Sequence, residues 1–172
     1  MLRMAKTLAC LGAALALASL GPAAGTAAAS GQFHHMPNVG TGLCFAPQSD
    51  SFGAPIIQED CGTADPGHFL DWQVSAPQGT NLIRLQNQGS GLCAFVLDDP
   101  GNGTPVTLDE CDLQGGGAVS NAEWNSFTRP PNAAQLRTLV GGRDHNLCLS
   151  GVSVALSVRT CNGADANQRW LI

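Results

Sequence analysis

Gly42-Leu43-Cys44, Gly91-Leu92-Cys93 and Asn146-Leu147-Cys148 open three copies of one short pattern. In each copy a second Cys follows the first by 13 to 18 positions, and a Trp follows that second Cys by 9 to 13 positions. The second cysteines are Cys61, Cys111 and Cys161, and the tryptophans are Trp72, Trp124 and Trp170. The pattern uses all three Trp and six of the seven Cys, so we infer that one structural unit is written three times.

The first residues have the layout of a secretory signal peptide. Arg3 and Lys6 precede an apolar run over residues 8–20, and small residues follow up to Ser30. A run of 13 residues is shorter than the roughly 20 that a membrane-spanning helix needs, so we predict no membrane span. The small residues at 27 and 29 predict cleavage after Ala29, with a signal peptide over 1–29 and a secreted single domain over 30–172. Cys10 lies inside the apolar run, which continues well past it, so lipid attachment there is the less favoured alternative.

Six cysteines remain after the predicted cleavage, and oxidising compartments convert such even sets into disulfides. A zinc site is the alternative, but no Cys-x-x-Cys pair is present. Six cysteines allow 15 pairings in principle. The threefold repeat selects the one in which each unit closes its own loop, namely Cys44–Cys61, Cys93–Cys111 and Cys148–Cys161.

The charge balance excludes several classes of partner. Without Arg3 and Lys6 the chain keeps six Arg and no Lys against 13 acidic residues, a net charge of 6 − 13 = −7 with His neutral. This excess of acid argues against nucleic acid and against an anionic membrane surface as partners. The four His, at positions 34, 35, 68 and 145, do not form a metal-binding motif, so we predict neither a metal nor a cofactor.

Frequent Gly and Pro, short apolar runs and the lack of long amphipathic periods predict an all-β domain with little helix. Gly101-Asn102-Gly103-Thr104 has the residues of a tight hairpin. Asn102-Gly103-Thr104 also matches the acceptor motif for N-glycosylation, but the hairpin already accounts for these residues. The repeats, about 50 residues long, predict four strands each, in lobes over about 32–80, 81–133 and 134–172. Three units are too few for a propeller, so we predict a closed three-lobed barrel. The twelve expected strands are 32–35, 42–45, 55–58, 71–74, 82–85, 92–97, 105–108, 124–127, 135–140, 147–149, 154–158 and 169–172.

The order of Gly-Leu-Cys, hairpin, second Cys and Asp165-Ala166-Asn167-Gln168-Arg169-Trp170 resembles the ricin B-type β-trefoil lectins, whose signature is Gln-x-Trp. The resemblance covers about residues 32–172, and it implies a β-trefoil that binds carbohydrate. The signature is intact only at Gln168-Arg169-Trp170, because the other lobes have Leu70-Asp71-Trp72 and Ala122-Glu123-Trp124. In that family the signature residues support the fold, which implies a structural role for Gln168, Trp72, Trp124 and Trp170.

The same resemblance places the sugar-binding positions. Family members use an Asp two positions after the first Cys, an aromatic two before the second Cys, and an Asn just before the signature Gln. These groups suit a sugar, since a carboxylate and an amide each grip hydroxyls and a ring covers the apolar face. In this chain the Asp positions hold Ala46, Phe95 and Ser150, the aromatic positions hold Glu59, Asp109 and Arg159, and the Asn positions hold Phe69, Asn121 and Asn167. Only the two Asn match.

The third lobe is the first candidate site, with Ser150, Arg159 and Asn167 expected around one shallow pocket. The second lobe is next, with Asp109 and Asn121, and Asp98-Asp99 on a nearby loop could supply the missing carboxylate. The first lobe is the least favoured.

No catalytic motif accompanies these residues. Adjacent acids such as Asp98-Asp99 point to opposite faces when they lie on a strand, so they do not make a glycosidase dyad, and no Gly-x-Ser-x-Gly or His-Glu-x-x-His is present. We therefore predict a non-enzymatic, secreted carbohydrate-binding protein. The alternative is a protein-interaction subunit, because residues 81–87 leading into Gly91-Leu92-Cys93 also resemble the binding subunits of cytolethal distending toxins. A trefoil protease inhibitor is a third hypothesis without specific support.

Overall fold

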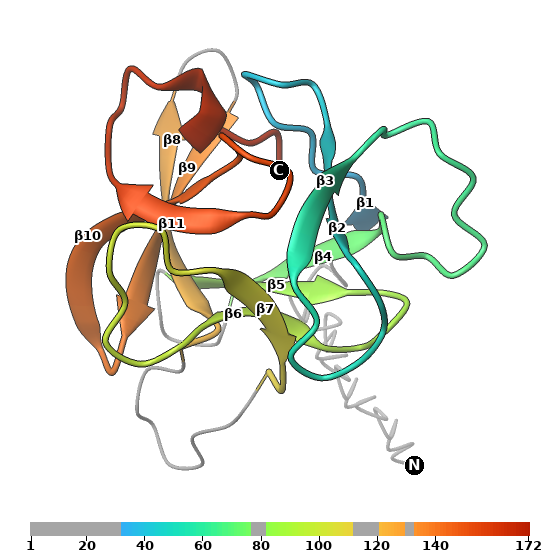
Figure 1. Cartoon of the computed structure of the whole chain (residues 1–172), viewed down its shortest axis with the longest axis horizontal. Coiled ribbons are helices and arrows are strands. Elements are labelled where there is room, and N and C mark those ends of the chain that lie inside the picture. Colours follow the sequence, from blue (N-terminus) through green and yellow to red (C-terminus); the bar gives the residue numbers. More distant parts are fainter. Residues whose placement is uncertain (1–31, 77–81, 112–120, 130–132) are drawn as a thin grey trace, which may run out of the picture.

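The computed structural model describes residues 32–76, 82–111, 121–129 and 133–172. Its regular elements are eleven strands and one turn of 3₁₀ helix (Figure 1). The strands are β1 (Phe33–His34), β2 (Cys44–Pro47), β3 (Ile56–Glu59), β4 (Trp72–Ser75), β5 (Leu82–Asn87), β6 (Cys93–Val96), β7 (Val106–Asp109), β8 (Glu123–Arg129), β9 (Ala133–Val140), β10 (Arg143–Ser150) and β11 (Ser157–Thr160), and the 3₁₀ helix is η1 (Ala166–Gln168). Within these ranges no helix has the length and apolar character needed to cross a bilayer.

A barrel of antiparallel strands forms one layer of the fold. The order β1-β4-β5-β8-β9 runs around it, and Trp170 closes the ring by bridging Ala134 of β9 on one side and Asn38, just after β1, on the other. Closure removes the free sheet edges that would otherwise invite association.

Three hairpins, β2–β3, β6–β7 and β10–β11, cap the barrel and surround a common centre in Figure 1. Each hairpin contacts the next in a cycle, through the bridges Pro55 to Thr107, Pro105 to Ser157 and Ile57 to Ala155. A closed barrel with three capping hairpins is the predicted β-trefoil.

The three tryptophans occupy equivalent places in the core. Each indole is fully buried, and each Nε1 donates to the carbonyl of the residue directly after the first Cys of its lobe. The bonds are Trp72 to Phe45 O at 2.7 Å, Trp124 to Ala94 O at 3.2 Å and Trp170 to Leu149 O at 3.3 Å. A buried indole needs such an acceptor, so the repeated spacing of Cys and Trp follows from the threefold geometry.

The small residue that opens each copy of the pattern is set by the backbone. Gly42, Gly91 and Asn146 have φ values of 73°, 70° and 54°, a left-handed conformation that Gly and Asn tolerate best. The cysteine two positions later begins or continues a strand, and the three disulfides join Cys44 to Cys61, Cys93 to Cys111 and Cys148 to Cys161. The predicted pairing is confirmed.

Most predicted strands are present with bounds shifted by one to four residues, but the strand expected over 169–172 is wrong. The 3₁₀ turn η1, capped by Asp165, ends just before this segment, and Arg169 is already extended. Trp170 then bridges Asn38 on one side and Ala134 on the other at single positions, so no continuous ladder forms. The predicted signal peptide over 1–29 lies outside the described residues.

Candidate functional site

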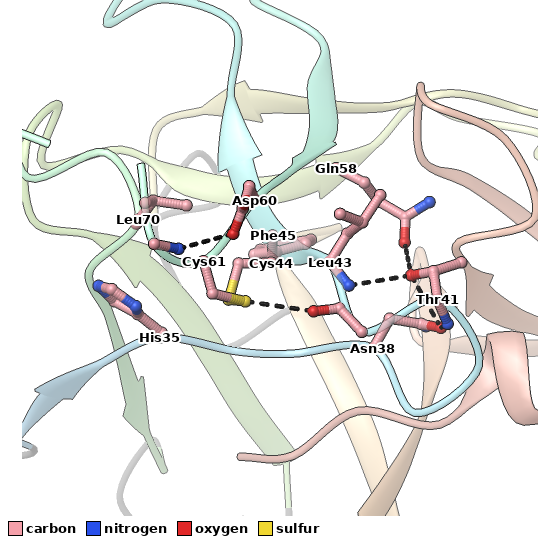
Figure 2. The surroundings of a disulfide bond; sticks show 12 residues. His35, Asn38, Thr41, Leu43, Cys44, Phe45, Gln58, Asp60, Cys61 and Leu70 are labelled. Atoms are coloured by element: carbon pink, nitrogen blue, oxygen red, sulfur yellow. Dashed lines mark hydrogen bonds between the residues drawn. A yellow bond between two sulfur atoms is a disulfide. The ribbon is translucent and has the colours of Figure 1, made fainter. Parts of the chain in front are cut away.

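The first lobe is closed at the position where the resemblance implies a sugar site. Ala46 and Leu70 pack with Cys44 in a small apolar cluster in which all three are at most 1 % exposed, and Cys61 packs against it. Figure 2 shows Leu70 beside this disulfide. Glu59 lies opposite Cys44 in the hairpin. An aliphatic cluster offers no hydrogen bonds to a sugar hydroxyl, so this position supports packing.

The second lobe has a similar apolar cluster beside its disulfide. Phe95 and Ala122 pack with Cys93, and Cys111 lies against them. Asp109 lies opposite Cys93 and is 7 % exposed. Burial raises the pKa of the Asp109 carboxyl, a hydrogen bond from Glu110 N opposes this, and the Glu110 charge adds to the rise. Asp109 is therefore a largely buried acid beside an apolar cluster.

The third lobe keeps a polar pair where the other lobes are apolar. Gln168 is 2 % exposed, donates to Thr160 O, and accepts from Asn162 N and Gln135 Nε2. Ser150 is fully buried, and its Oγ has no hydrogen-bond partner among the described residues. Gln168 thus holds the backbone around the disulfide, while Ser150 lies below the surface.

Asn167 is also engaged in the fold. Its backbone carbonyl accepts from Gly151 N at 2.9 Å and from Asn38 Nδ2 at 2.9 Å, and its side-chain amide donates to Asp165 Oδ1. The backbone of Gly40 packs closely against its side-chain oxygen. Arg159 is exposed on β11 opposite Cys148. Of the three residues predicted for this lobe, one is buried, one is bonded to its neighbours, and one faces solvent.

A pocket of about 390 Å³ lies instead at the junction of the second and third lobes. We call it the seam pocket, and its lining residues are Asp98, Asp99, Val140, Gly141, Arg143 and His145. The two acids follow β6 in the second lobe, whereas the other four residues belong to the β9–β10 turn and the strands beside it. The pocket is therefore assembled from two lobes.

The turn between β9 and β10 gives this junction its shape. Val140 pairs with Arg143, and the two residues between them, Gly141 and Gly142, have φ values of 56° and 74°. Positive φ at both central positions is the requirement of the two-residue hairpin turn that matches strand twist, and Gly meets it without strain. The turn fixes Arg143 at the start of β10, on the rim of the pocket.

The other two junctions between lobes are bridged differently. There the turn carries an Asn whose amide donates across the junction, from Asn38 to Asn167 O and from Asn87 to Phe69 O. In Figure 2, Asn38 lies beside Thr41, whose hydroxyl donates to Gln58. At the third junction the turn has Gly141 and Gly142, and the bridging amide comes from Asn121, which accepts from Gly141 N at 3.1 Å.

Asn121 also orients the acidic wall of the pocket. Its Nδ2 donates to Asp98 Oδ1 at 2.7 Å, and the residue itself is 8 % exposed. Both ends of the amide are used, so Asn121 positions Asp98 and the turn. Asp98 is exposed, and among the described residues only its Oδ1 has a hydrogen-bond partner.

The charges that face the pocket do not neutralise one another. In the described parts of the chain, no ion pair joins Asp98 or Asp99 to Arg143 or His145, although acids stand on one side and nitrogen donors on the other. Asp144, the neighbour of Arg143, pairs with Arg137 at 2.8 Å instead. Asp99 has a φ of 51°, an uncommon conformation for a residue with a side chain. The residues present in the described ranges include no cluster of His, Cys, Asp or Glu able to hold a metal ion.

The family model for the ricin-type β-trefoil lectin domain matches residues 32–170. The chain belongs to this family. No curated protein matches it. Among solved structures it is similar to the designed threefold-symmetric protein ThreeFoil, with a TM-score of 0.65, 18 % identity, and coverage of 80 % of this chain and 95 % of that one. It is also similar to the Rhizoctonia solani agglutinin, with a TM-score of 0.64, 15 % identity, and coverage of 81 % and 92 %. The cytolethal distending toxin of Haemophilus ducreyi gives a TM-score of 0.62, 16 % identity, and coverage of 83 % of both chains.

This chain departs from the ricin-type pattern at the positions that the resemblance assigns to sugar binding. Two lobes have apolar residues at both the Asp and the Gln positions, and the third lobe has the buried polar residues Ser150 and Gln168 there. The structure brings the predicted residues Asn121 and Asp98 into contact, but Asp109, Ser150, Arg159 and Asn167 do not line the seam pocket. Sequence reasoning missed Arg143 and His145. The sequence does mark this turn as different. Six positions before the first Cys, the other lobes have Asn38 and Asn87, whereas this lobe has Gly142, preceded by Gly141.

Proposed function

We propose that this ricin-type trefoil is a secreted, non-catalytic protein that binds carbohydrate at the seam pocket. Three disulfides support export to an oxidising compartment. The pocket volume of about 390 Å³ falls in the range of small-ligand sites, about 300 to 1,000 Å³. Its lining is mainly polar and exposed, as expected for a ligand rich in hydroxyls.

One observation supports this proposal more than the others. The bonds from Asn121 to Asp98 and from Gly141 to Asn121 hold a carboxylate at the pocket with one oxygen available. A carboxylate held in one orientation accepts hydrogen bonds from hydroxyls and loses little freedom when it does so. Asp98 thereby replaces the carboxylate that is missing two positions after Cys93, where Phe95 stands.

We assign the third-lobe residues a smaller part. Ser150 is buried, and the Asn167 amide is bonded to Asp165, so neither group is free to grip a sugar without rearrangement. Arg159 is exposed but does not line the seam pocket, so we assign it no contact with a ligand there.

The test is a glycan array and a polysaccharide pull-down on the wild type, Asp98→Ala and Asp50→Ala. Asp50 is the control because it is exposed on the corresponding loop of the first lobe and does not line the pocket. Binding by the wild type and by Asp50→Ala, with loss in Asp98→Ala, is the expected result. If the wild type binds no saccharide, the proposed function is wrong.

A protein-interaction subunit is the second candidate. Phe52, Val152 and Val154 on the hairpin turns are 65 %, 51 % and 68 % exposed, and exposed apolar side chains are common where proteins associate. A partner that co-purifies with the wild type but not with Phe52→Ser, together with a failed glycan array, would favour this function.

A further inference from the structure

The geometry points to an acidic saccharide as the ligand of the seam pocket: a sugar whose hydroxyls bind Asp98 and Asp99 and whose acid group binds Arg143. This inference rests on the proposed function and adds the chemical class of the ligand. It uses residues from two lobes, and Arg143 lies outside the positions that the family resemblance assigns.

The pocket is polarised. Asp98 and Asp99 come from the segment after β6, and Arg143 and His145 come from β10. Across the described residues the two sides form no ion pair, so each remains available to a ligand in the space between them. The Gly141-Gly142 turn on one side and the Asn121 amide on the other fix the two walls.

The two walls need different chemical groups. A carboxylate only accepts hydrogen bonds, so sugar hydroxyls satisfy Asp98 and Asp99 without any cation. A guanidinium only donates, and its planar fork forms the strongest bonds with a carboxylate or another oxyanion. A ring that carries both hydroxyls and an acid group therefore satisfies both walls.

Other saccharide classes fit less well. A neutral sugar offers Arg143 only hydroxyl oxygens, which are weaker acceptors than an ionised acid. An amino sugar satisfies the acidic wall but gives Arg143 no oxyanion and places like charge near it, whereas an acid group bound to Arg143 lies across the pocket from Asp98 and Asp99. The choice is thus decided by Arg143, whose guanidinium has no side-chain hydrogen bond or ion pair with any described residue.

The overall negative charge does not prevent this binding. The chain has a formal net charge of −5, which repels anions at long range. At physiological ionic strength charges more than about 8 Å apart in solvent are largely screened, so contacts inside the pocket decide the preference.

The test compares acidic, neutral and basic saccharides. The probes are galacturonate and glucuronate oligomers, their methyl esters, neutral galactose and glucose oligomers, and glucosamine oligomers, each titrated calorimetrically into the wild type, Arg143→Ala, Arg143→Lys and Asp98→Ala. We expect an acidic oligomer to bind the wild type about tenfold more tightly than its ester, which corresponds to about 1.4 kcal/mol. The preference should shrink in 0.5 M salt, vanish in Arg143→Ala and be partly kept in Arg143→Lys. Asp98→Ala should lose both the acid and the ester.

The outcomes distinguish carbohydrate binding at the seam pocket from the preference for an acidic saccharide. Equal binding of acid and ester by the wild type, or tighter binding of glucosamine oligomers, overturns the acidic class and leaves carbohydrate binding in place. An acid preference that survives in Arg143→Ala also overturns it. Binding of none of the probes, together with a blank glycan array, overturns the proposed function and this inference with it.

Discussion

Asn121 Nδ2 donates to Asp98 Oδ1 at 2.7 Å, while Asn121 Oδ1 accepts from Gly141 N at 3.1 Å, so one buried amide ties an acidic loop to the turn of the next lobe. Asn121→Ala breaks both bonds and frees Asp98. A hydrogen bond to a charged group contributes about 1.5 to 3 kcal/mol, so we expect affinity for the ligand to fall by a factor on the order of 10 to 100. Calorimetric titration with the best saccharide from the array measures it.

A double-mutant cycle shows whether Asn121 acts through Asp98. If it does, Asn121→Ala adds little to the loss already caused by Asp98→Ala. Asn87→Ala is the matched control, because the Asn87 amide also bridges two lobes, by donating to Phe69 O, at a junction without the pocket residues. It should lower stability and leave binding unchanged. Fully additive losses in the cycle would show that Asn121 contacts the sugar directly.

The sequence predicts the fold well because the repeated residues are those that the barrel requires. Trp72, Trp124 and Trp170 find the same backbone acceptor in each lobe, and the left-handed residue before each Leu-Cys recurs with them. Such local requirements leave a regular spacing in the chain. The strand expected over 169–172 failed because Trp170 pairs with Asn38 and Ala134 only at single positions.

The candidate site is harder to predict because it is assembled across a junction. Aligning each lobe with the others compares positions within a lobe, so it pointed to Asn121 and to the nearby Asp98. It could not place Arg143 or His145, which reach the pocket from the turn of the following lobe. Asn167 likewise packs against Gly40 of the first lobe, which no spacing within the third lobe reveals.

Ser150→Ala tests whether the third-lobe hydroxyl serves the fold or a ligand. The Ser150 Oγ is fully buried, with no hydrogen-bond partner among the described residues, and an unpaired buried hydroxyl is costly. We expect the substitution to raise stability by up to about 1 kcal/mol in chemical denaturation and to leave saccharide binding unchanged. A loss of both stability and binding would show that the hydroxyl is engaged.

Gln168→Leu is expected to act in the opposite direction. Leu70 stands at the equivalent position of the first lobe, where it packs with Ala46, but Gln168 makes three hydrogen bonds around its disulfide. Removing them leaves Thr160 O and Asn162 N without their partner, at a cost of about 2 to 4 kcal/mol. Combining Gln168→Leu with Ser150→Ala should recover part of this loss, because the pair then resembles the first lobe. Denaturation curves of the two single variants and the double variant measure the coupling.

Replacing Cys148 and Cys161 together by Ala should destabilise the protein by about 3 kcal/mol, since the bridge closes a loop of 13 residues. The other bridges close loops of 17 and 18 residues and should contribute similar amounts. Thermal unfolding of each paired variant, with unreduced peptide mapping as a control for bridge exchange, checks this. A negligible change in melting temperature would show that packing alone holds that lobe.

Asp109 and Asp144 should give opposite dependences of stability on pH. Burial raises the pKa of Asp109 from its ordinary value of 3.8, so ionising it costs stability in the folded state. For Asp144 burial acts in the same direction, but bonds from Arg137 and Asn146 N outweigh it and the pKa lies below 3.8. The stability contributed by protonated Asp109 is complete below about pH 4 and is lost as pH rises through the folded pKa of Asp109. The stability contributed by ionised Asp144 is complete above about pH 4 and is lost as pH falls through the folded pKa of Asp144.

Asp109→Asn should therefore match the wild type in acid and exceed its stability at pH 7. Asp144→Asn should be less stable than the wild type at pH 7 and approach it below about pH 3. Urea denaturation of the three proteins between pH 2.5 and 8 measures both trends, and the two variants act as each other's control. A neutral-pH loss of stability in Asp109→Asn would mean that the ionised carboxylate is stabilised in the fold, contrary to its burial opposite Cys93 and next to Glu110.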